Sequence, residues 1–257
     1  MRCAFAPFQG ANMSQSVESY TTNTLLSALS DADLALLKPH LTRVNIEWKQ
    51  VLVTADEPID LVYFPEGGVA SIVSTSEEDG RTEVGIFGRD GVSASALILG
   101  TDRSPHETFI QVDGATALRM DADRFTEMLD ESSTFRRKMG NYIQTLLIQT
   151  AQSAVANAHH RIESRLARWL LMCHDRADGD EINLTHEFMA MMIGANRGGV
   201  TISLHILEGA GMIRSKRSKV IILDREKLHE IAGESYGQPE AEYRRLIGPI
   251  GPPSAVG

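Results

Sequence analysis

The stretch LTHEFMAMMIGANRGGVTISLHILEGAGMIRSKRSKVIIL, residues 184–223, decides how the C-terminal part of this chain folds. Thr185 is a good helix N-cap, and apolar side chains follow it at helical spacing as far as Ile193. Gly194 comes next, where a sharp turn between two helices needs a residue that tolerates positive φ. A second amphipathic helix is predicted after this turn and ends at Gly209.

Two short strands joined by a basic turn follow the second helix. The strands are predicted at 212–215 and 219–223, and the turn between them is Lys216-Arg217-Ser218. Helix, glycine turn, helix and small hairpin in this order predict a winged helix-turn-helix, whose second helix enters the major groove of DNA. The alternative is a plain pair of core helices around a glycine, and the basic hairpin favours DNA binding.

The two halves of the chain differ in the sign of their charge. Residues 1–134 hold 9 Lys and Arg against 21 Asp and Glu, a balance of −12. Residues 135–257 hold 16 against 13, a balance of +3, which brings the whole chain to −9. The basic half carries the helix-turn-helix, a pattern that indicates an acidic sensor or scaffold joined to a nucleic-acid module.

Cysteine usage and hydropathy exclude several classes of protein. Cys3 and Cys173 are the only two cysteines, and they match neither an iron–sulfur cluster nor a zinc site. No apolar run approaches the roughly 20 residues that span a bilayer. The N-terminal MRCAFAPFQGAN is a poor secretory signal, and Met13 is a candidate natural start. We therefore expect a cytoplasmic protein with no membrane partner.

The N-terminal half is predicted as a helical lid followed by a small antiparallel jelly roll. Closely spaced leucines indicate helices between residues 23 and 41, with Ser30 as a cap. From Val44 the hydrophobic period changes to two, and turn residues separate the strand-like runs that follow. These runs are 51–54, 61–64, 69–74, 82–87, 93–98, 107–112 and 116–120. No helix-period segment interrupts them, which favours a jelly roll.

A long helix is predicted from residue 133 to about 157, after a short helix at 121–129. One stripe of the long helix has heptad spacing and consists of Phe135, Met139, Tyr142, Leu146, Gln149, Ser153 and Ala156. A second stripe beside it contains Ile143, Leu147, Thr150 and Ala154. One stripe can face the barrel while the other faces a twin helix, and we assign the heptad stripe to a homodimer interface. The alternative is a single wide face that packs only within the monomer.

This order of elements resembles the Crp/Fnr family of bacterial transcription regulators, over about residues 25–228. The most specific parts are RLARWLL (165–171), LTHEFMAMMIG (184–194) and LEGAGMIR (207–214). The resemblance implies an α+β fold with a cyclic-nucleotide-binding-like jelly roll, a dimerisation helix and a winged helix-turn-helix. The corresponding segments are a disordered tail at 1–22, the jelly roll at 23–132, the dimerisation helix at 133–158, the DNA-binding domain at 159–232 and a C-terminal tail at 233–257.

The resemblance places Arg197 at the base-reading arginine position of the family. An arginine there can bond O6 and N7 of guanine together, which is worth about 1–3 kcal/mol of discrimination. Gly198 and Ile202 stand where many family members carry further readers, so we expect a different operator from that of the cyclic-AMP receptor. Candidates for phosphate contact or helix capping are Thr185, Asn196, Thr201, Ser203 and His205, and candidates for gripping the backbone from the wing are Lys216, Arg217 and Lys219.

The region that holds the nucleotide in some family members corresponds to residues 88–112. Gly88, Asp90 and His106 are the candidate pocket residues, with Asp90 near the position of the family glutamate and His106 near that of the phosphate arginine. An acidic neighbour and a mostly neutral histidine suit a phosphodiester poorly, so we do not expect cyclic AMP as a ligand. No haem, iron–sulfur cluster or other cofactor is expected, and the effector stays unidentified.

The function that these residues favour is a homodimeric, sequence-specific regulator. Its expected partner is double-stranded DNA, and RNA polymerase is a further candidate. One alternative is a signalling protein that binds a small molecule in the jelly roll without reading DNA. The other alternative is a jelly-roll enzyme, but the sequence has no His-x-His pair for a metal, so neither a metal site nor an enzyme activity is expected.

Overall fold

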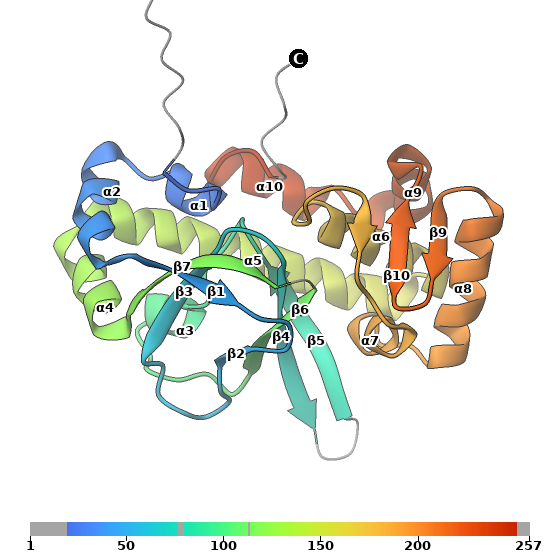
Figure 1. Ribbon diagram of the computed structural model, residues 1–257, viewed down its shortest axis with the longest axis horizontal. Helices are drawn as coiled ribbons and strands as arrows, with labels where there is room; N and C mark the ends of the chain where they lie inside the picture. Colours follow the sequence, from blue (N-terminus) through green and yellow to red (C-terminus); the bar gives the residue numbers. More distant parts are fainter. Residues whose placement is uncertain (1–19, 77–79, 113, 251–257) are drawn as a thin grey trace, which may run out of the picture.

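The computed structural model describes residues 20–76, 80–112 and 114–250. A β-barrel forms one end of the molecule, and a domain built mainly of helices forms the other (Figure 1). One long helix runs along both parts (Figure 1). This is the α+β arrangement that the sequence predicts.

Three short helical segments precede the barrel, as the leucine spacing predicts. They are α1 (Thr24–Ser27), α2 (Asp31–Leu37) and the 3-10 helix η1 (Lys38–His40). Asn23 and Ser30 cap α1 and α2, because their side-chain oxygens accept hydrogen bonds from backbone N–H groups three residues on. The buried leucines of these segments join the core between the barrel and the long helix.

Antiparallel strands in two sheets form the barrel. They are β1 (Thr42–Ile46), β2 (Val51–Val53), β3 (Leu61–Pro65), β4 (Val69–Ser76), β5 (Gly80–Phe87), β6 (Glu107–Val112) and β7 (Ala115–Asp121). The strand orders are β1-β7-β3 and β2-β6-β4-β5. The predicted antiparallel N-terminal domain is therefore confirmed.

The segment 93–98 is not a strand, and this part of the prediction was wrong. Ser95–Ile98 forms a short helix, α3. Ala94, Ala96 and Leu97 are all buried, which does not fit the two-residue alternation of a half-buried strand. Ser93 accepts a hydrogen bond from Tyr63 N (2.9 Å), so the chain reaches α3 through a loop fixed to β3.

Two helices follow the barrel at the predicted places, α4 (Ala122–Glu131) and α5 (Ser133–His159). Ser132 caps α5, because its Oγ accepts a hydrogen bond from Phe135 N (3.1 Å). Phe125 of α4 and Phe135 of α5 are fully buried and pack edge to face, with 5.5 Å between ring centroids. This contact anchors the start of α5 against the barrel core.

The C-terminal domain is the predicted winged helix-turn-helix. Its elements are α6 (Ile162–His174), β8 (Glu181–Ile182), α7 (His186–Met192), α8 (Arg197–Gly209), β9 (Ile213–Lys216), β10 (Lys219–Ile222) and α9 (Arg225–Ala232). The strands form an antiparallel sheet in the order β8-β10-β9. Buried apolar residues of α6, including Trp169, belong to the hydrophobic core of this C-terminal domain.

The segment after α9 is not a loose tail as far as residue 250. It forms the 3-10 helix η2 (Gly233–Ser235) and α10 (Gln238–Leu246), which packs along α5. Glu240 accepts a hydrogen bond from Gly237 N (2.8 Å) at the start of α10, and Tyr243 and Ile247 bury one side of it. Only one turn of apolar spacing marks this helix in the sequence, too little to separate it from a polar tail.

Several expectations concern parts of the chain outside the described ranges. These are the tail before residue 20, with Cys3 and Met13, and the last residues, 251–257. None of the helices within the described ranges combines the length and the apolar character that a membrane crossing requires.

Candidate nucleic-acid interface

Capping residues and one glycine fix the two helices of the motif. Thr185 Oγ1 accepts a hydrogen bond from Phe188 N (3.2 Å) and starts α7. Gly194 has a φ of +56°, the left-handed backbone that the turn requires, and its carbonyl accepts a hydrogen bond from Arg165 (2.9 Å). Asn196 Oδ1 accepts a hydrogen bond from Gly199 N (2.8 Å) and starts α8. Thr185 and Asn196 thus have capping roles.

The helix α8 has one buried and one exposed face. Its inward face consists of Val200, Ser203, Leu204 and Leu207. Ser203 is only 1% exposed, so the prediction that it contacts DNA was wrong. The outward face carries Arg197, Gly198, Ile202, His205 and Ile206, at the spacing that covers one side of a helix.

Close packing explains why a glycine follows Gly198. A Cβ on Gly199 would lie 2.8 Å from Ile162 Cδ1, so a larger residue here would have to push the end of the Ile162 side chain aside. A Cβ on Gly198 would meet only the capping Asn196 Oδ1, at 3.3 Å. The position next to Arg197 is therefore exposed and carries no side chain that could read a base.

Arg197 is exposed at the first position of α8. Thr201 Oγ1 donates a hydrogen bond to the carbonyl of Arg197 (3.0 Å) and lies 3.1 Å from His186 Nδ1. Burial, and then the charges of Arg197 and His205, lower the pKa of His186. His186 is therefore biased towards its neutral form. The guanidinium of Arg197 makes no ion pair within the described residues.

The wing adds cations beside this helix. Ser218 has a φ of +58° in the tight turn between β9 and β10. Lys216 and Arg217 are exposed, and neither forms an ion pair in the part of the chain that the structure describes. Lys219 is bonded to Glu181 of β8, so its charge is already partly neutralised. The predicted wing residues are thus brought together, with two of them unpaired.

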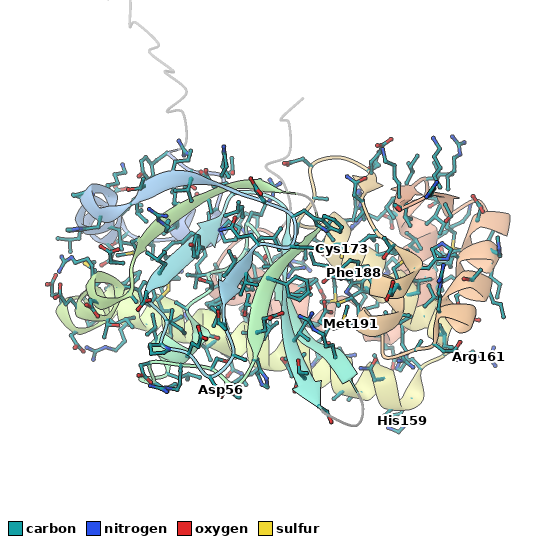
Figure 2. All side chains as sticks on the ribbon, turned by 60° about the horizontal axis from the view of Figure 1, so that its bottom comes forward. Asp56, His159, Arg161, Cys173, Phe188 and Met191 are labelled. Carbon is teal, nitrogen blue, oxygen red and sulfur yellow. The ribbon has the colours of Figure 1, made fainter. Side chains whose placement is uncertain are left out.

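Sequence reasoning missed two features of this surface. Ile206 is 49% exposed one turn after Ile202, which is 61% exposed, so the outward face of α8 presents an apolar pair. The four-residue spacing in the sequence could have shown this pair. Arg161 is also exposed, directly before the Ile162 that touches the first turn of α8, at the junction of α5 and α6 (Figure 2). It is a further candidate for phosphate contact.

Comparison with known proteins agrees with this geometry. Residues 164–231 match the family model of the Crp-like helix-turn-helix domain. FixK2 of Bradyrhizobium japonicum is similar with a TM-score of 0.63 at 16% identity, over 75% of this chain and 98% of that one. A CRP/FNR-family transcriptional regulator of Thermus thermophilus gives 0.58 at 20% identity, over 74% and 98%. The chain has a Crp/Fnr-type fold. No curated protein sequence matches it.

A third similar structure is CLP of Xanthomonas campestris, described as a c-di-GMP responsive global regulator. It gives a TM-score of 0.60 at 14% identity, over 75% of this chain and 99% of that one. At these identities the likeness establishes the Crp/Fnr fold and leaves the ligand open.

The heptad stripe of α5 faces inward in this Crp/Fnr fold. Phe135 and Met139 are fully buried, and the Tyr142 hydroxyl donates a hydrogen bond to Val92 O (3.2 Å). Gln149 accepts a hydrogen bond from Ile86 N (2.8 Å). The stripe consists of Phe135, Met139, Tyr142, Leu146, Gln149, Ser153 and Ala156. From the sequence we expected it to form a dimer interface, but in the structure it packs within the monomer.

The outward side of α5 carries different residues. Leu147 and Val155 are 60% and 47% exposed, and Gly140, Ala151 and Ala154 lie exposed around them. Leu147 and Ala154 belong to the second stripe that the sequence shows. This face, and not the heptad stripe, is the part of α5 that is open to a second molecule.

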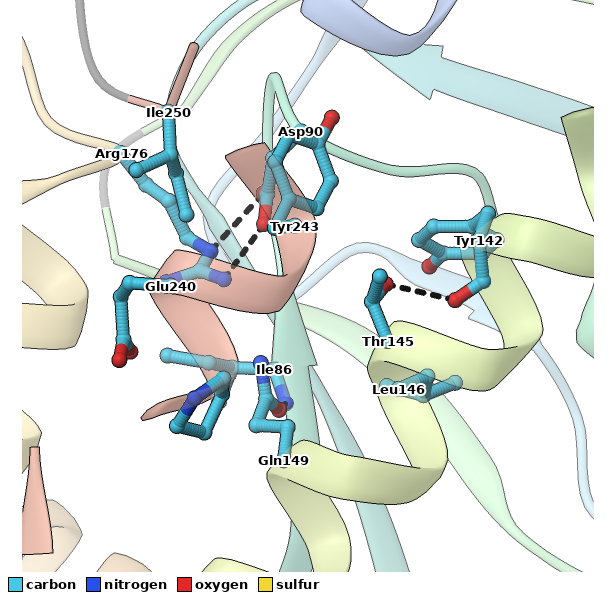
Figure 3. Close-up of a pocket in the computed structure, with 11 residues that line it drawn as sticks. Ile86, Asp90, Tyr142, Thr145, Leu146, Gln149, Arg176, Glu240, Tyr243 and Ile250 are labelled. Atoms are coloured by element: carbon cyan, nitrogen blue, oxygen red, sulfur yellow. Dashed lines mark hydrogen bonds and ion pairs between the residues drawn. The ribbon is translucent and has the colours of Figure 1, made fainter. Parts of the chain in front are cut away.

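Asp90 lines only a small cavity, of about 20 Å³, beside α10. Asp90 is buried and accepts a hydrogen bond from Arg176 Nε (2.9 Å), and the two side chains face each other beside α10 (Figure 3). Gly88 N donates a hydrogen bond to Asp90 Oδ1 (2.8 Å). The partner of Asp90 comes from the segment after α6, so the expected ligand position is occupied by an ion pair between domains. Of the three candidates, only His106 lines a sizeable cavity.

Further contacts hold the winged helix-turn-helix domain on the barrel. Trp169 Nε1 of α6 donates a hydrogen bond to Glu83 Oε1 of β5 (3.0 Å). Trp48 packs edge to face on Phe188 of α7, with 6.3 Å between ring centroids. The two domains therefore share a buried interface, and a movement of the helix-turn-helix relative to the barrel would have to break it.

Proposed function

We propose that this protein is a homodimeric regulator of transcription that binds double-stranded DNA in a sequence-specific manner. The observation that carries the proposal is the exposed, unpaired Arg197 at the start of α8 in a Crp-like helix-turn-helix. A guanidinium at this place can reach base edges in the major groove, where its planar fork matches guanine. Lys216 and Arg217 on the wing would hold the phosphate backbone.

The outward face of α5 supports the dimer. Leu147 and Val155 are large apolar side chains on a long helix, and small residues between them would allow a second helix to approach closely. Crp/Fnr regulators commonly dimerise, and a two-fold axis along α5 would give the pair two copies of α8. Such a pair matches a palindromic site with half-sites about one DNA turn apart.

The charge distribution supports a selective binder. The chain has a net charge of −9, with its positive balance in the C-terminal half. An acidic N-terminal domain weakens nonspecific attraction to phosphate, so affinity would depend on a correct operator and on low to moderate salt. The same proposal includes RNA polymerase as a further partner, a cytoplasmic location and the absence of enzyme activity.

We also propose that cyclic AMP is not the effector. The acidic residue of the presumed nucleotide site, Asp90, is committed to Arg176. The position of the phosphate arginine is held by His106 beside Glu107, and Glu107 is bonded to Arg81. Arg103 lines the same cavity as His106 and is already paired with Asp102, so a cyclic phosphate would have to compete with that carboxylate for the cation. Titration with cyclic AMP up to millimolar concentration should give no saturable heat.

The test of the main proposal is selection of bound duplexes from a random pool with the full-length protein. We expect a palindromic consensus, bound as two protomers per duplex in sedimentation or mass photometry. Recovery of no consensus at low salt would contradict sequence-specific binding. One protomer on a single half-site would contradict the dimer. Arg244→Ala removes an exposed cation from α10, which is outside α8 and the wing, and should leave the selected consensus unchanged.

A further inference from the structure

A large apolar side chain lies in the middle of the outward face of α8. Ile202 is 61% exposed, and Ile206, one turn further along the helix, is 49% exposed. The opposite face of the helix is buried and consists of Val200, Ser203, Leu204 and Leu207. The two isoleucines therefore point away from the protein, towards whatever α8 meets.

Few other side chains in the first two turns of α8 are available for contact with a base. Asn196 Oδ1 accepts a hydrogen bond from Gly199 N (2.8 Å) and so serves as the helix cap. Thr201 Oγ1 donates to the carbonyl of Arg197 (3.0 Å), so its hydroxyl proton is already used. The exposed side chains that remain in these two turns are those of Arg197 and Ile202.

The backbone of α8 is open to close approach just before Ile202. Gly198 lies one turn before Ile202 on the same side of the helix and is exposed. Within the described residues, a Cβ at this position would meet only Asn196 Oδ1, at 3.3 Å. A glycine at such a place lets another molecule come close to the main chain. The side chain of Ile202 can therefore reach further into a groove than it could beside a bulky neighbour.

The charges around this isoleucine fit a polyanion. Arg197, Lys216 and Arg217 are exposed, and none of them forms an ion pair in the described part of the chain. Glu208 is the one acidic residue in the sequence of α8, and its Oε1 accepts a hydrogen bond from Ser215 N of the wing (2.9 Å). Phosphates line the major groove of DNA, and the C5-methyl of thymine is the apolar group among the base edges inside it. Cations beside an apolar centre match this surface.

We propose that Ile202 reads the C5-methyl group of a thymine in each half-site of the operator. Ile202 follows Arg197 by five positions, which is about 7.5 Å along the helix axis, or about two base pairs of DNA. The thymine therefore lies about two base pairs from the guanine that Arg197 contacts. This contact rests on the proposed function, because α8 has to enter the major groove to make it.

Uracil in place of thymine removes the methyl group and keeps the base pair. Burial of one methyl group changes affinity about 3- to 5-fold, so replacement in both half-sites should weaken binding about 10- to 25-fold. The test uses the full-length protein and the operator selected from the random pool, at fixed salt. Each thymine is replaced by uracil in turn, and we expect one sensitive position in each half-site.

Variants of α8 assign the effect to a side chain. Ile202→Ala should bind the thymine and uracil operators with equal affinity, whereas Ile202→Val keeps most of the apolar contact and should still discriminate. Ile231→Ala removes an isoleucine of α9 that is 36% exposed, and this matched control should discriminate like the unaltered protein. At the sensitive position, 5-methylcytosine should bind more tightly than cytosine by the same factor, because it carries the same methyl group.

Three results would overturn the assignment of Ile202. They are equal affinities of the unaltered protein for thymine and uracil operators, a selected half-site without thymine near the guanine, and a methyl effect that persists in Ile202→Ala. A failure of the proposed function gives a different result, since no consensus is then recovered from the pool. A consensus that is bound without any sensitivity to the methyl group counts against Ile202 alone.

Discussion

The ion pair between Asp90 and Arg176 offers the most direct test of what stabilises this protein. Both side chains are almost fully buried, and Arg176 Nε lies 2.9 Å from Asp90 Oδ1. Arg176 Nη1 also donates to Met172 O (2.7 Å). Burial alone would lower the pKa of Arg176, but the charges of Asp90 and Asp175 outweigh it and raise the pKa. Arg176 therefore keeps its charge beside the carboxyl group of Asp90.

Arg176→Met removes the cation and leaves a buried carboxylate. Asp90 keeps only the hydrogen bond from Gly88 N (2.8 Å) among its described partners. Removing one member of a buried pair typically costs about 3–5 kcal/mol. The double variant Asp90→Asn/Arg176→Met has no charge left at this pair. Its loss of unfolding free energy should be about 1–3 kcal/mol smaller than the sum of the losses in the two single variants. The barrel and the winged helix-turn-helix domain should also separate more readily.

The assay is equilibrium unfolding in urea, followed by circular dichroism and by the fluorescence of Trp48 and Trp169. Arg124→Met is the control, because Arg124 pairs with Glu127 and Glu131 on the surface of α4, and its loss should matter far less. A cost of Arg176→Met below about 1 kcal/mol, or strictly additive single and double variants, would refute the reasoning.

Three further predictions concern pH, packing and assembly. Burial raises the pKa of Glu83 to about 8, so its folded state favours the protonated form, and its contribution to stability is lost as pH rises from about 4.5 through about 8. In urea titrations, the free energy of unfolding of Glu83→Gln should therefore rise relative to that of the unaltered protein between pH 5 and pH 9. A difference between the two proteins that does not change with pH would contradict this prediction. The Cβ of Gly199→Ala would meet Ile162 Cδ1, the movable end of a side chain, at 2.8 Å, and alanine adds about 1 kcal/mol of helix propensity, so the free energy of unfolding should change by less than about 1 kcal/mol in urea titrations; a loss above about 2 kcal/mol would mean that Ile162 cannot move aside. Leu147→Arg should give a monomer in sedimentation and lower operator affinity about 100-fold, and a stable dimer would mean that another face of the chain pairs.

Local signals in the sequence predicted most of the fold. The caps at Ser30 and Thr185, the positive φ of Gly194 and the change of period at Val44 each depend on residues within one turn of the chain. There are two exceptions. The apolar run at 93–98 suits a strand or a buried helix equally well, and α10 has too short an apolar pattern to be separated from a polar tail. Existence and type of the long elements were therefore predictable.

Contacts between distant segments were not predictable. Both stripes of α5 are apolar enough to be buried, so spacing alone could not tell which one the barrel would cover. Asp90 meets an arginine from the end of α6, and no local pattern shows that pairing. Ser203 lies on the inward side of α8 and is 1% exposed, although its residue type suits a phosphate contact equally.

The central claim is that Arg197 reads a base while the wing holds only the backbone. The most direct measurement compares the affinities of Arg197→Ala and Lys216→Ala for the selected operator and for operators with each base pair changed, at fixed salt. The account predicts that Arg197→Ala loses discrimination at one base pair of each half-site, by about 1–3 kcal/mol, while Lys216→Ala weakens all duplexes alike. An equal loss of affinity across all operators for both variants would contradict it.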